Sequence, residues 1–320
     1  MPIEVRVKSI VWEAPGIHSY ELVPLSQTQL PAFSAGAHID IILPNGMTRQ
    51  YSLHSSPEER HHYIITILHL PRGRGGSDAI HSKTRPGDIL SISEPRNHFA
   101  LVEGASRYVL VAGGIGVTPL IAMMAKLAQL KSDYVLHYCC RSRETAAFSN
   151  ALEAQLATGR VVFHEDGGVP ANGLNVAELF DQHQEGTQVY CCGPTGLMSA
   201  VRQATSGWPS DAVHFESFSE RSTPGPPPID RADDTEFEVE LASTGRTVSV
   251  SHHQTILEAL RAAGLNVDSS CEAGTCGACK TRYLEGEPDH QDFVLSHAEQ
   301  EEYLMVCVSR SKSTRIKLDL

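Results

Sequence analysis

Residues 270–279 read SCEAGTCGAC, which spaces Cys271, Cys276 and Cys279 as C-x4-C-x2-C, and Cys307 follows 28 positions after the last of these. This is the ligand spacing of plant-type [2Fe-2S] clusters. Three thiolates on one tight loop can wrap a cluster, and the small residues between them let backbone N–H groups approach its sulfur atoms. The fourth cysteine lies in the apolar run LMVCVS, which predicts a strand. The sequence therefore predicts that these four cysteines are metal ligands.

Other roles for the cysteines fit less well. A structural zinc site usually takes two C-x2-C pairs, whereas this chain has one, and purely structural thiols are the remaining alternative for the loop. The other four cysteines form the adjacent pairs Cys139–Cys140 and Cys191–Cys192 within apolar runs. Adjacent cysteines bridge badly, so we expect these four to be small buried side chains in a reducing compartment.

The segments around the cysteine loop predict a separate small domain. Residues 237–251 read FEVELASTGRTVSVS, typical of a β-hairpin, and residues 255–264 read TILEALRAAG, a helix ended by its final glycine. Residues 219–234 contain four prolines and one glycine among mixed charges, which is typical of a linker. We therefore expect a linker over residues 223–234 and an iron–sulfur domain over residues 235–320.

Residues 103–222 alternate continuous apolar strands with helices. The predicted strands are YVLVAGG (108–114), YVLHYCC (134–140), RVVFHED (160–166) and TQVYCCG (187–193). An amphipathic helix, TPLIAMMAKLAQLK, follows the first of them. This alternation predicts a parallel, doubly wound sheet of the Rossmann-like α/β class.

Residues 1–102 have a different pattern, in which short segments of alternating apolar and polar residues are separated by turns. The segments are EVRVKSI (4–10), AHIDIIL (37–43), YIITIL (63–68) and DILSIS (88–93). The turns between them are rich in proline, glycine and asparagine. Many short strands with regular turns predict a small antiparallel barrel or sandwich.

A glycine-rich turn in the α/β region fits a dinucleotide. Residues 112–119 read AGGIGVTP between a buried strand and its helix, where a pyrophosphate would lie. The stretch matches G-x-G-x-x-P, and the position about 20 residues further on, where an acidic residue is usual, holds Arg141-Ser142-Arg143. The two arginines could bind the 2′-phosphate of NADPH, or they could simply cap the end of a strand. We therefore predict NADH as the coenzyme and keep NADPH as the alternative.

Two stretches in the first region fit a flavin. Residues 49–53 read RQYSL at the end of a strand. Residues 72–77 read RGRGGS before a short helix, where backbone amides and a hydroxyl can surround a phosphate. Each stretch alone is a weak signal, because the first could be ordinary surface and the second a glycine-rich hairpin.

The order and combination of these motifs resemble the phthalate dioxygenase reductase family, the single-chain reductases of Rieske-type aromatic-ring oxygenases, similar to vanillate demethylase reductase. The resemblance covers essentially the whole chain. It implies a multidomain β and α/β fold with an antiparallel flavin-binding β-barrel over residues 1–102 and a Rossmann-like NAD-binding parallel α/β domain over residues 103–222. The linker at 223–234 would then lead to a C-terminal plant-type [2Fe-2S] ferredoxin β-grasp domain over residues 235–320.

The resemblance also implies the residues at each cofactor. Ser52 and Thr118 would polarise the flavin N5 and fix its orientation, in a site that needs no general acid or base. Leu68 and His69 occupy a stretch that often carries a basic residue in the family, so no phosphate contact is assigned there. The residues implied for FMN are Arg49, Gln50, Tyr51, Ser52, Thr66, Ile67, Gly75, Gly76, Ser77, Thr118 and Phe218. Those implied for the nicotinamide nucleotide are Gly113, Gly114, Gly116, Pro119, Cys192, Gly193, Pro194 and Glu216.

The implied function is that of an NADH-dependent reductase component. Electrons would pass from NADH through FMN to the [2Fe-2S] cluster and on to a Rieske-type terminal oxygenase or demethylase of aromatic catabolism. Two alternatives remain: an FAD-containing NAD(P)H reductase with a different acceptor, and a non-catalytic ferredoxin-like redox interaction protein. A loop suited to a terminal phosphate favours FMN over FAD, and the intact nucleotide motifs argue against the second alternative.

Charge and composition limit the partners and the compartment. The formal net charge is −12, and residues 233–320 hold 16 acidic and 8 basic side chains. Nucleic-acid binding needs clustered Lys and Arg and is therefore not expected. A solvated surface explains the acidic C-terminal part most simply, and a docking face for a basic partner is the alternative. Residues 1–10 predict a strand rather than a signal peptide, and no window could span a membrane, so we expect a monomeric cytoplasmic protein.

Overall fold

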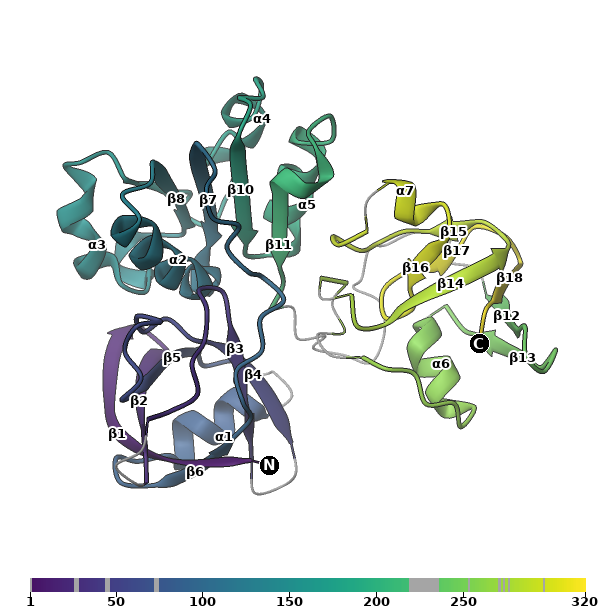
Figure 1. Cartoon of the computed structure of the whole chain (residues 1–320), viewed down its shortest axis with the longest axis horizontal. Coiled ribbons are helices and arrows are strands. Elements are labelled where there is room, and N and C mark those ends of the chain that lie inside the picture. The colour runs from purple at the N-terminus through teal and green to yellow at the C-terminus, as the bar shows by residue number, and fades with distance from the viewer. Residues whose placement is uncertain are drawn as a thin grey trace. The chain divides into compact units, whose positions relative to one another are not determined.

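The computed structural model describes residues 2–320 with gaps (Figure 1). The residues left out are 26–28, 44–46, 72–74, 219–235, 253, 270, 271, 273, 276 and 296. The predicted linker at 223–234 and the predicted ligands Cys271 and Cys276 therefore lie outside the described residues. The chain divides into two compact units, Met1–Glu216 and Ser217–Leu320. Among the described residues, no helix is long and apolar enough to cross a membrane.

The first sheet of the N-terminal unit is the predicted antiparallel barrel. Its six strands hydrogen-bond in the order β4-β3-β6-β1-β2-β5, and a bridge between Leu53 and Ile65 joins the two ends of the sheet. Alternate side chains such as Ile39 and Ile41 are fully buried, because successive side chains of a strand point to opposite faces. The elements are β1 (Ile3–Ala14), β2 (Ile17–Pro24), β3 (His38–Ile42), β4 (Thr48–Ser52), β5 (Tyr63–Leu68), α1 (Gly76–Lys83) and β6 (Ile89–Ile92).

The second sheet of this unit is parallel, as predicted, with the order β11-β10-β7-β8-β9. The chain proceeds from β7 outward to β9 and then returns to the other side of β7, so the strand order switches between β7 and β10. Ligands of doubly wound sheets bind outside the carboxyl ends of the strands at such a point. The elements are β7 (Arg107–Gly113), η1 (Gly114–Gly116), α2 (Val117–Gln129), β8 (Tyr134–Cys140), η2 (Arg143–Thr145), α3 (Ser149–Leu156), β9 (Val161–Glu165), η3 (Pro170–Asn172), α4 (Val176–Leu179), β10 (Thr187–Cys192), α5 (Thr195–Ala204), η4 (Ser210–Ala212) and β11 (Val213–Glu216).

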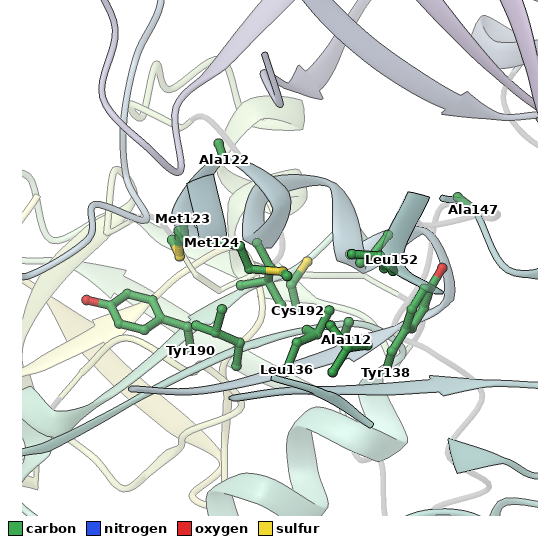
Figure 2. Close-up of a cluster of buried hydrophobic side chains, with 14 of the residues drawn as sticks. Ala112, Ala122, Met123, Met124, Leu136, Tyr138, Ala147, Leu152, Tyr190 and Cys192 are labelled. Atoms are coloured by element: carbon green, nitrogen blue, oxygen red, sulfur yellow. The ribbon is translucent and has the colours of Figure 1, made fainter. Parts of the chain in front are cut away.

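Helix α2 packs its apolar face on this sheet and forms the largest buried cluster (Figure 2). The four cysteines of the sheet lie in or beside this core: Cys191 and Cys192 have no exposed surface, Cys140 is buried and Cys139 is partly buried. Burial raises the pKa of Cys139 to about 12 and that of Cys140 to about 11. These residues therefore act as small buried side chains, as the sequence predicted.

The barrel and the parallel sheet are in contact through the chain segment that joins them. Phe99 packs edge-on against Tyr190 of β10, with ring centroids 5.4 Å apart. The backbone N–H of Val102 donates to the Tyr190 hydroxyl at 2.7 Å. Gly36, with φ +93°, lies against the same segment, and a Cβ there would be 2.0 Å from the carbonyl oxygen of Phe99. At Gly36, the barrel thus meets the joining segment where no side chain fits.

The C-terminal unit contains a five-stranded sheet of order β13-β12-β18-β14-β16, in which β12 and β18 are parallel. The hairpin and helix predicted before the cysteine loop are present as β12–β13 and α6. Thr255 caps α6 by accepting from the Glu258 N–H, and the Glu258 carboxylate accepts from the Thr255 N–H, a reciprocal capping box. The elements are β12 (Phe237–Leu241), β13 (Thr247–Val250), α6 (Ile256–Ala262), β14 (Lys280–Glu285), β15 (Pro288–Asp289), α7 (His297–Gln300), β16 (Tyr303–Met305), β17 (Arg310–Ser311) and β18 (Arg315–Leu318).

The junction at Gly36 gives a stability prediction. Gly36→Ala should lower the free energy of unfolding by about 3 kcal/mol or more, because the left-handed backbone disfavours a side chain and the new Cβ would collide with Phe99. Gly16→Ala is the matched control: Gly16 also has a positive φ, +73°, but a Cβ there meets nothing within 4 Å, so about 1 kcal/mol is expected. Urea unfolding of the full chain measures both, and equal losses would contradict the steric explanation.

Candidate functional site

The predicted phosphate site is built by β4 and the start of α1. Gly75 precedes the helix with φ +78°, and Gly76 is its first residue. A Cβ on Gly76 would lie 2.3 Å from Nε of Arg49, so the Arg49 side chain crosses directly over the helix start. The hydroxyl of Ser77 accepts from the backbone N–H of Leu70 at 3.1 Å. A guanidinium beside the N-terminus of a helix is an environment that favours a phosphate.

The end of β4 approaches the carboxyl ends of two strands of the parallel sheet. Ser52 is buried, and its hydroxyl donates to the carboxylate of Glu216 at 3.5 Å. Glu216 ends β11 and pairs with Cys192, the last residue of β10. Burial, aided by the nearby Glu216 carboxylate, raises the pKa of Cys192 well above its usual value, so this thiol stays protonated. The structure therefore brings three of the predicted residues together from both halves of the unit.

The predicted dinucleotide glycines have two different roles. A Cβ on Gly116 would lie 2.2 Å from the carbonyl oxygen of Cys192, and one on Gly193 would lie 2.9 Å from Cα of Gly113. These three glycines allow the turns after β7 and β10 to pack backbone against backbone. Gly114 differs, because it has φ +53° and a Cβ there would face open space. Gly114 is therefore the position at which a nucleotide could approach the backbone.

The residues that follow complete the helix start. The Thr118 hydroxyl is buried and donates to the carbonyl oxygen of Ile115 at 3.0 Å, so its oxygen remains available only as an acceptor. Pro119 lies in the first turn of α2, where its missing N–H costs nothing. Pro194 precedes α5 and lies against Gly113, with Cδ 2.5 Å from the position of a Cβ on that glycine.

The other residues predicted to bind the flavin lie at positions that point less clearly to a flavin contact. The Thr66 hydroxyl bonds to Ser19 and to Nε2 of His54, both at 2.7 Å, and the Ile67 side chain lies in the barrel core. Contacts from these two positions to a flavin would therefore come from the backbone. Gln50 is exposed on β4, Tyr51 packs at the edge of the barrel core, and Phe218 is part of the second unit.

The strand ends next to the dinucleotide turn contain an acidic residue that the sequence analysis missed. Arg143 donates to Glu165 twice, from its backbone N–H at 3.0 Å and from Nε at 3.2 Å. Its guanidinium also lies 4.9 Å above the ring of Phe163. Glu165 ends β9, which is one strand beyond the position where an acidic residue was expected. The sequence HEDGG at the end of β9 could have indicated this residue.

The described part of the cysteine loop fits a cluster. Cys279 and Cys307 are buried, 3% and 1% exposed, and the N–H of Val306 donates to the carbonyl oxygen of Cys279 at 3.4 Å. Between the predicted ligand positions, the backbone takes left-handed values at Glu272, Gly274 and Gly277, with φ of 51°, 72° and 77°. A loop that turns this tightly can direct N–H groups toward sulfur atoms. Within the described residues, no three potential metal ligands converge.

Two family models match the chain. The model described as "2Fe-2S iron-sulfur cluster binding domain" matches residues 239–312, and the model described as "Oxidoreductase NAD-binding domain" matches residues 110–203. The first contains Cys279 and Cys307, two of the four cysteines predicted to be cluster ligands. The second contains the glycine turn and the strand end at Cys192.

Whole-chain relatives extend these matches. The reductase subunit of tert-butanol monooxygenase / tert-amyl alcohol desaturase from Aquincola tertiaricarbonis is 43% identical, over 99% of this chain and 96% of that protein. Vanillate O-demethylase oxidoreductase from Pseudomonas sp. (strain HR199 / DSM 7063) is 43% identical, over 99% of this chain and 100% of that protein. The solved structure of phthalate dioxygenase reductase is 39% identical with a TM-score of 0.70, over 100% of this chain and 98% of that one. The chain therefore belongs to the phthalate dioxygenase reductase family, whose members are NADH-dependent oxidoreductases with a flavin and a [2Fe-2S] cluster.

Proposed function

We propose that this chain is the NADH-dependent reductase component of a Rieske-type oxygenase or demethylase, with FMN as its flavin. The observation that carries the proposal is the contact of Ser52 on the barrel with Glu216 at the carboxyl edge of the parallel sheet. A flavin held by the barrel and a nicotinamide held by that edge would face each other there. The same chain continues into a [2Fe-2S] domain, so input and output of electrons belong to one polypeptide.

On the flavin side, Arg49, Gly75, Gly76 and Ser77 would hold the FMN phosphate. The phosphate would lie at the N-terminus of α1, where backbone N–H groups and the guanidinium favour negative charge. Tyr51 and Ser52 would hold the ring, and Thr66 and Ile67 would contribute backbone contacts. A loop that ends on a phosphate suits FMN, whereas FAD would need space for a further nucleotide.

On the nicotinamide side, the turns after β7 and β10 would hold the dinucleotide. Gly114 offers open backbone, and Gly113, Gly116, Gly193 and Pro194 fix the two turns against each other. Cys192 would remain a neutral thiol beside the nicotinamide, because burial keeps its proton in place. Glu216 would hold Ser52 in position through their hydrogen bond.

The cofactors supply the redox chemistry when bound: the flavin takes two electrons from NADH and the cluster accepts them singly. The residues of this chain bind and orient them. Ser52 and Thr118 would fix the flavin at the stacking distance and, with the surrounding buried side chains, exclude water from the reacting faces. Cys271, Cys276, Cys279 and Cys307 would ligate the cluster.

The charged residues at the end of β9 support a preference for NADH over NADPH. Because Arg143 is already paired with Glu165 and stacked on Phe163, its charge is compensated within the protein. Glu165 itself would repel a 2′-phosphate placed there and could accept a hydrogen bond from a 2′-hydroxyl. Both effects support NADH over NADPH.

The remaining parts of the proposal concern boundaries and partners. Residues 1–102 would be the FMN domain, 103–222 the NAD domain, 223–234 a linker and 235–320 the ferredoxin domain. The Rieske-type oxygenase would be a separate protein, and this chain would be a monomer in the cytoplasm.

A second candidate differs in the oxygenase served. One relative is the reductase subunit of a tert-butanol monooxygenase, so the partner of this chain need not act on an aromatic ring. Turnover assays with a purified aromatic-ring oxygenase and with an alcohol monooxygenase separate the two. A rate at least about tenfold higher with one partner, at matched partner concentrations, identifies the class.

Flavin retention tests the phosphate site. Gly76→Ala should weaken FMN binding about tenfold or more, because its Cβ would displace the Arg49 side chain from the helix start. Gly196→Ala is the matched control, since a Cβ at that helical glycine meets nothing within 4 Å. Equilibrium dialysis or flavin fluorescence measures the dissociation constant. FMN affinity unchanged in Gly76→Ala would exclude this position from the site.

Coenzyme kinetics test the role of Glu165. Wild-type protein should oxidise NADH with a higher kcat/KM than NADPH, and Glu165→Gln should narrow this ratio about tenfold by freeing Arg143 and removing the carboxylate. Glu144→Gln is the control, because Glu144 is an exposed neighbour on the same turn that does not pair with Arg143 in the described contacts. If the ratio of kcat/KM for NADH to that for NADPH changed equally in both variants, the proposed role of Glu165 would be contradicted.

An anaerobic titration with NADH tests the whole path. The purified protein should bleach its flavin absorption and then develop a rhombic [2Fe-2S] EPR signal of about one spin per chain. Cys307→Ser should keep the flavin bleaching and lose the EPR signal, because it removes one cluster ligand. Flavin bleaching without a cluster signal in the wild-type protein would refute the oxygenase-reductase function.

A further inference from the structure

His54 lies on the side of the barrel that contacts the α/β half of the N-terminal unit. It follows Ser52 by two positions on a backbone that continues the ladder with β5, so the two side chains share one face, while Leu53 between them is buried in the barrel core. Ser52 donates to Glu216 of the parallel sheet at 3.5 Å. The imidazole of His54 lies 5.0 Å from the ring of Phe148, centroid to centroid. This short stretch therefore contacts the α/β half at two points.

Phe148 has an unusual backbone conformation for a bulky residue. It directly precedes α3 with φ +59°, in the left-handed region that favours glycine. Such a conformation is unfavourable and persists only where the surrounding contacts fix it. The Phe148 side chain packs against the buried cluster under α2. The ring that His54 contacts is therefore held in place by its own half of the unit.

A chain of side-chain hydrogen bonds holds His54 from the barrel side. Nε2 of His54 lies 2.7 Å from the Thr66 hydroxyl, which lies 2.7 Å from the Ser19 hydroxyl. The Ser19 hydroxyl in turn donates to the Glu13 carboxylate at 2.6 Å. Ser19 and Thr66 are buried, and the chain runs through β1, β2 and β5 before it reaches the imidazole. His54 is thus anchored to the body of the barrel.

The number of available protons gives the direction of each bond in this chain. A hydroxyl has one proton to donate. Because the Ser19 proton goes to the Glu13 carboxylate, the bond between the two hydroxyls uses the proton of Thr66. The bond between Thr66 and His54 must then use a proton on Nε2. Burial lowers the pKa of His54 to about 4, so the ring is neutral at neutral pH and carries only that proton. The chain therefore fixes both the orientation and the tautomer of His54.

We propose that His54 is a positioning residue for hydride transfer: anchored by this chain, it holds the barrel against the start of α3 so that flavin and nicotinamide meet at the reacting distance. A misplacement of about 1 Å can slow a reaction about a hundredfold, so the junction between the two halves controls the rate. The hydride leaves NADH with its electron pair and reduces the flavin, and His54 neither gives nor takes a proton. The inference rests on the proposed function, in which Ser52 lies at the flavin.

The competing explanation is that His54 only stabilises the barrel. Its loss would then lower the free energy of unfolding and leave the rate of hydride transfer in folded, flavin-loaded protein unchanged. His54→Leu keeps an apolar contact with Phe148 but cannot be held by the chain, whereas the amide of His54→Gln can still donate to Thr66. Thr66→Val removes the hydroxyl that links His54 to the chain and nearly keeps the side-chain shape.

The test is anaerobic stopped-flow reduction of the FMN-loaded full chain by NADH. His54→Leu and Thr66→Val should each lower the limiting rate constant of flavin reduction about tenfold or more, with the dissociation constants of NADH and FMN within about twofold of wild type. His54→Gln should restore most of the rate. The double variant should be no slower than the slower single variant, because both changes break one chain. Wild-type rates in both single variants, or losses that multiply in the double variant, would overturn the proposal.

Hydrogen–deuterium exchange gives a second readout that does not depend on turnover. In His54→Leu and Thr66→Val, backbone amides at the start of α3 should exchange faster than in the wild-type protein, because the contact with Phe148 is no longer held. Unchanged exchange in this region would mean that His54 does not hold the junction, and the proposal would fall.

Two controls separate the possible failures. Ser9→Ala breaks another Ser–Glu hydrogen bond between β1 and β2, from Ser9 to Glu21 at 2.9 Å, without touching the chain, and should keep the wild-type rate. An equal loss of rate in Ser9→Ala would mean that general loosening of the barrel is the cause, and would overturn the proposal. A wild-type protein whose flavin NADH does not reduce would instead reject the proposed function.

Discussion

The backbone contact between the turns after β7 and β10 is the constraint on which the nucleotide site depends. Gly113, Gly116 and Gly193 let two carboxyl-end turns touch without side chains between them. The contact lies at the end of β10, beside Glu216, whose carboxylate accepts a hydrogen bond from Ser52 of the barrel. Gly113 and Gly116 of the motif are thus needed for packing within the protein, whereas a Cβ on Gly114 would meet no atom within 4 Å.

The same principle recurs at the other redox centre. Gly274 brings the cysteine loop into contact with Asp292 and Val308 at distances that exclude a side chain. In both units, a glycine lacks the Cβ that any other residue would have, so a loop can pack closely against the strand or turn behind it. At both glycines the backbone is packed too closely for a side chain to fit.

The sequence predicted the fold class well, because two periodicities dominate it. Alternating burial in the barrel and continuous apolar strands such as β7 and β8 are strong signals over several residues. Strands β2 (Ile17–Pro24) and β11 (Val213–Glu216) were not among the predicted strands. The partner of Arg143 was missed because Glu165 lies on a strand that is adjacent in the sheet but 22 positions away in the chain. The fixed hydroxyl of Thr118 and the burial of Asp292 depend on tertiary contacts that no local pattern contains.

The buried thiols of the parallel sheet have a consequence for cluster assembly. Iron binds thiolates, and a thiol whose pKa is raised by burial offers no thiolate at neutral pH. Cys139, Cys140, Cys191 and Cys192 are in that state once the sheet has formed. Of the eight cysteines in the chain, the four of the parallel sheet are therefore poor candidates for metal binding once the α/β region has folded.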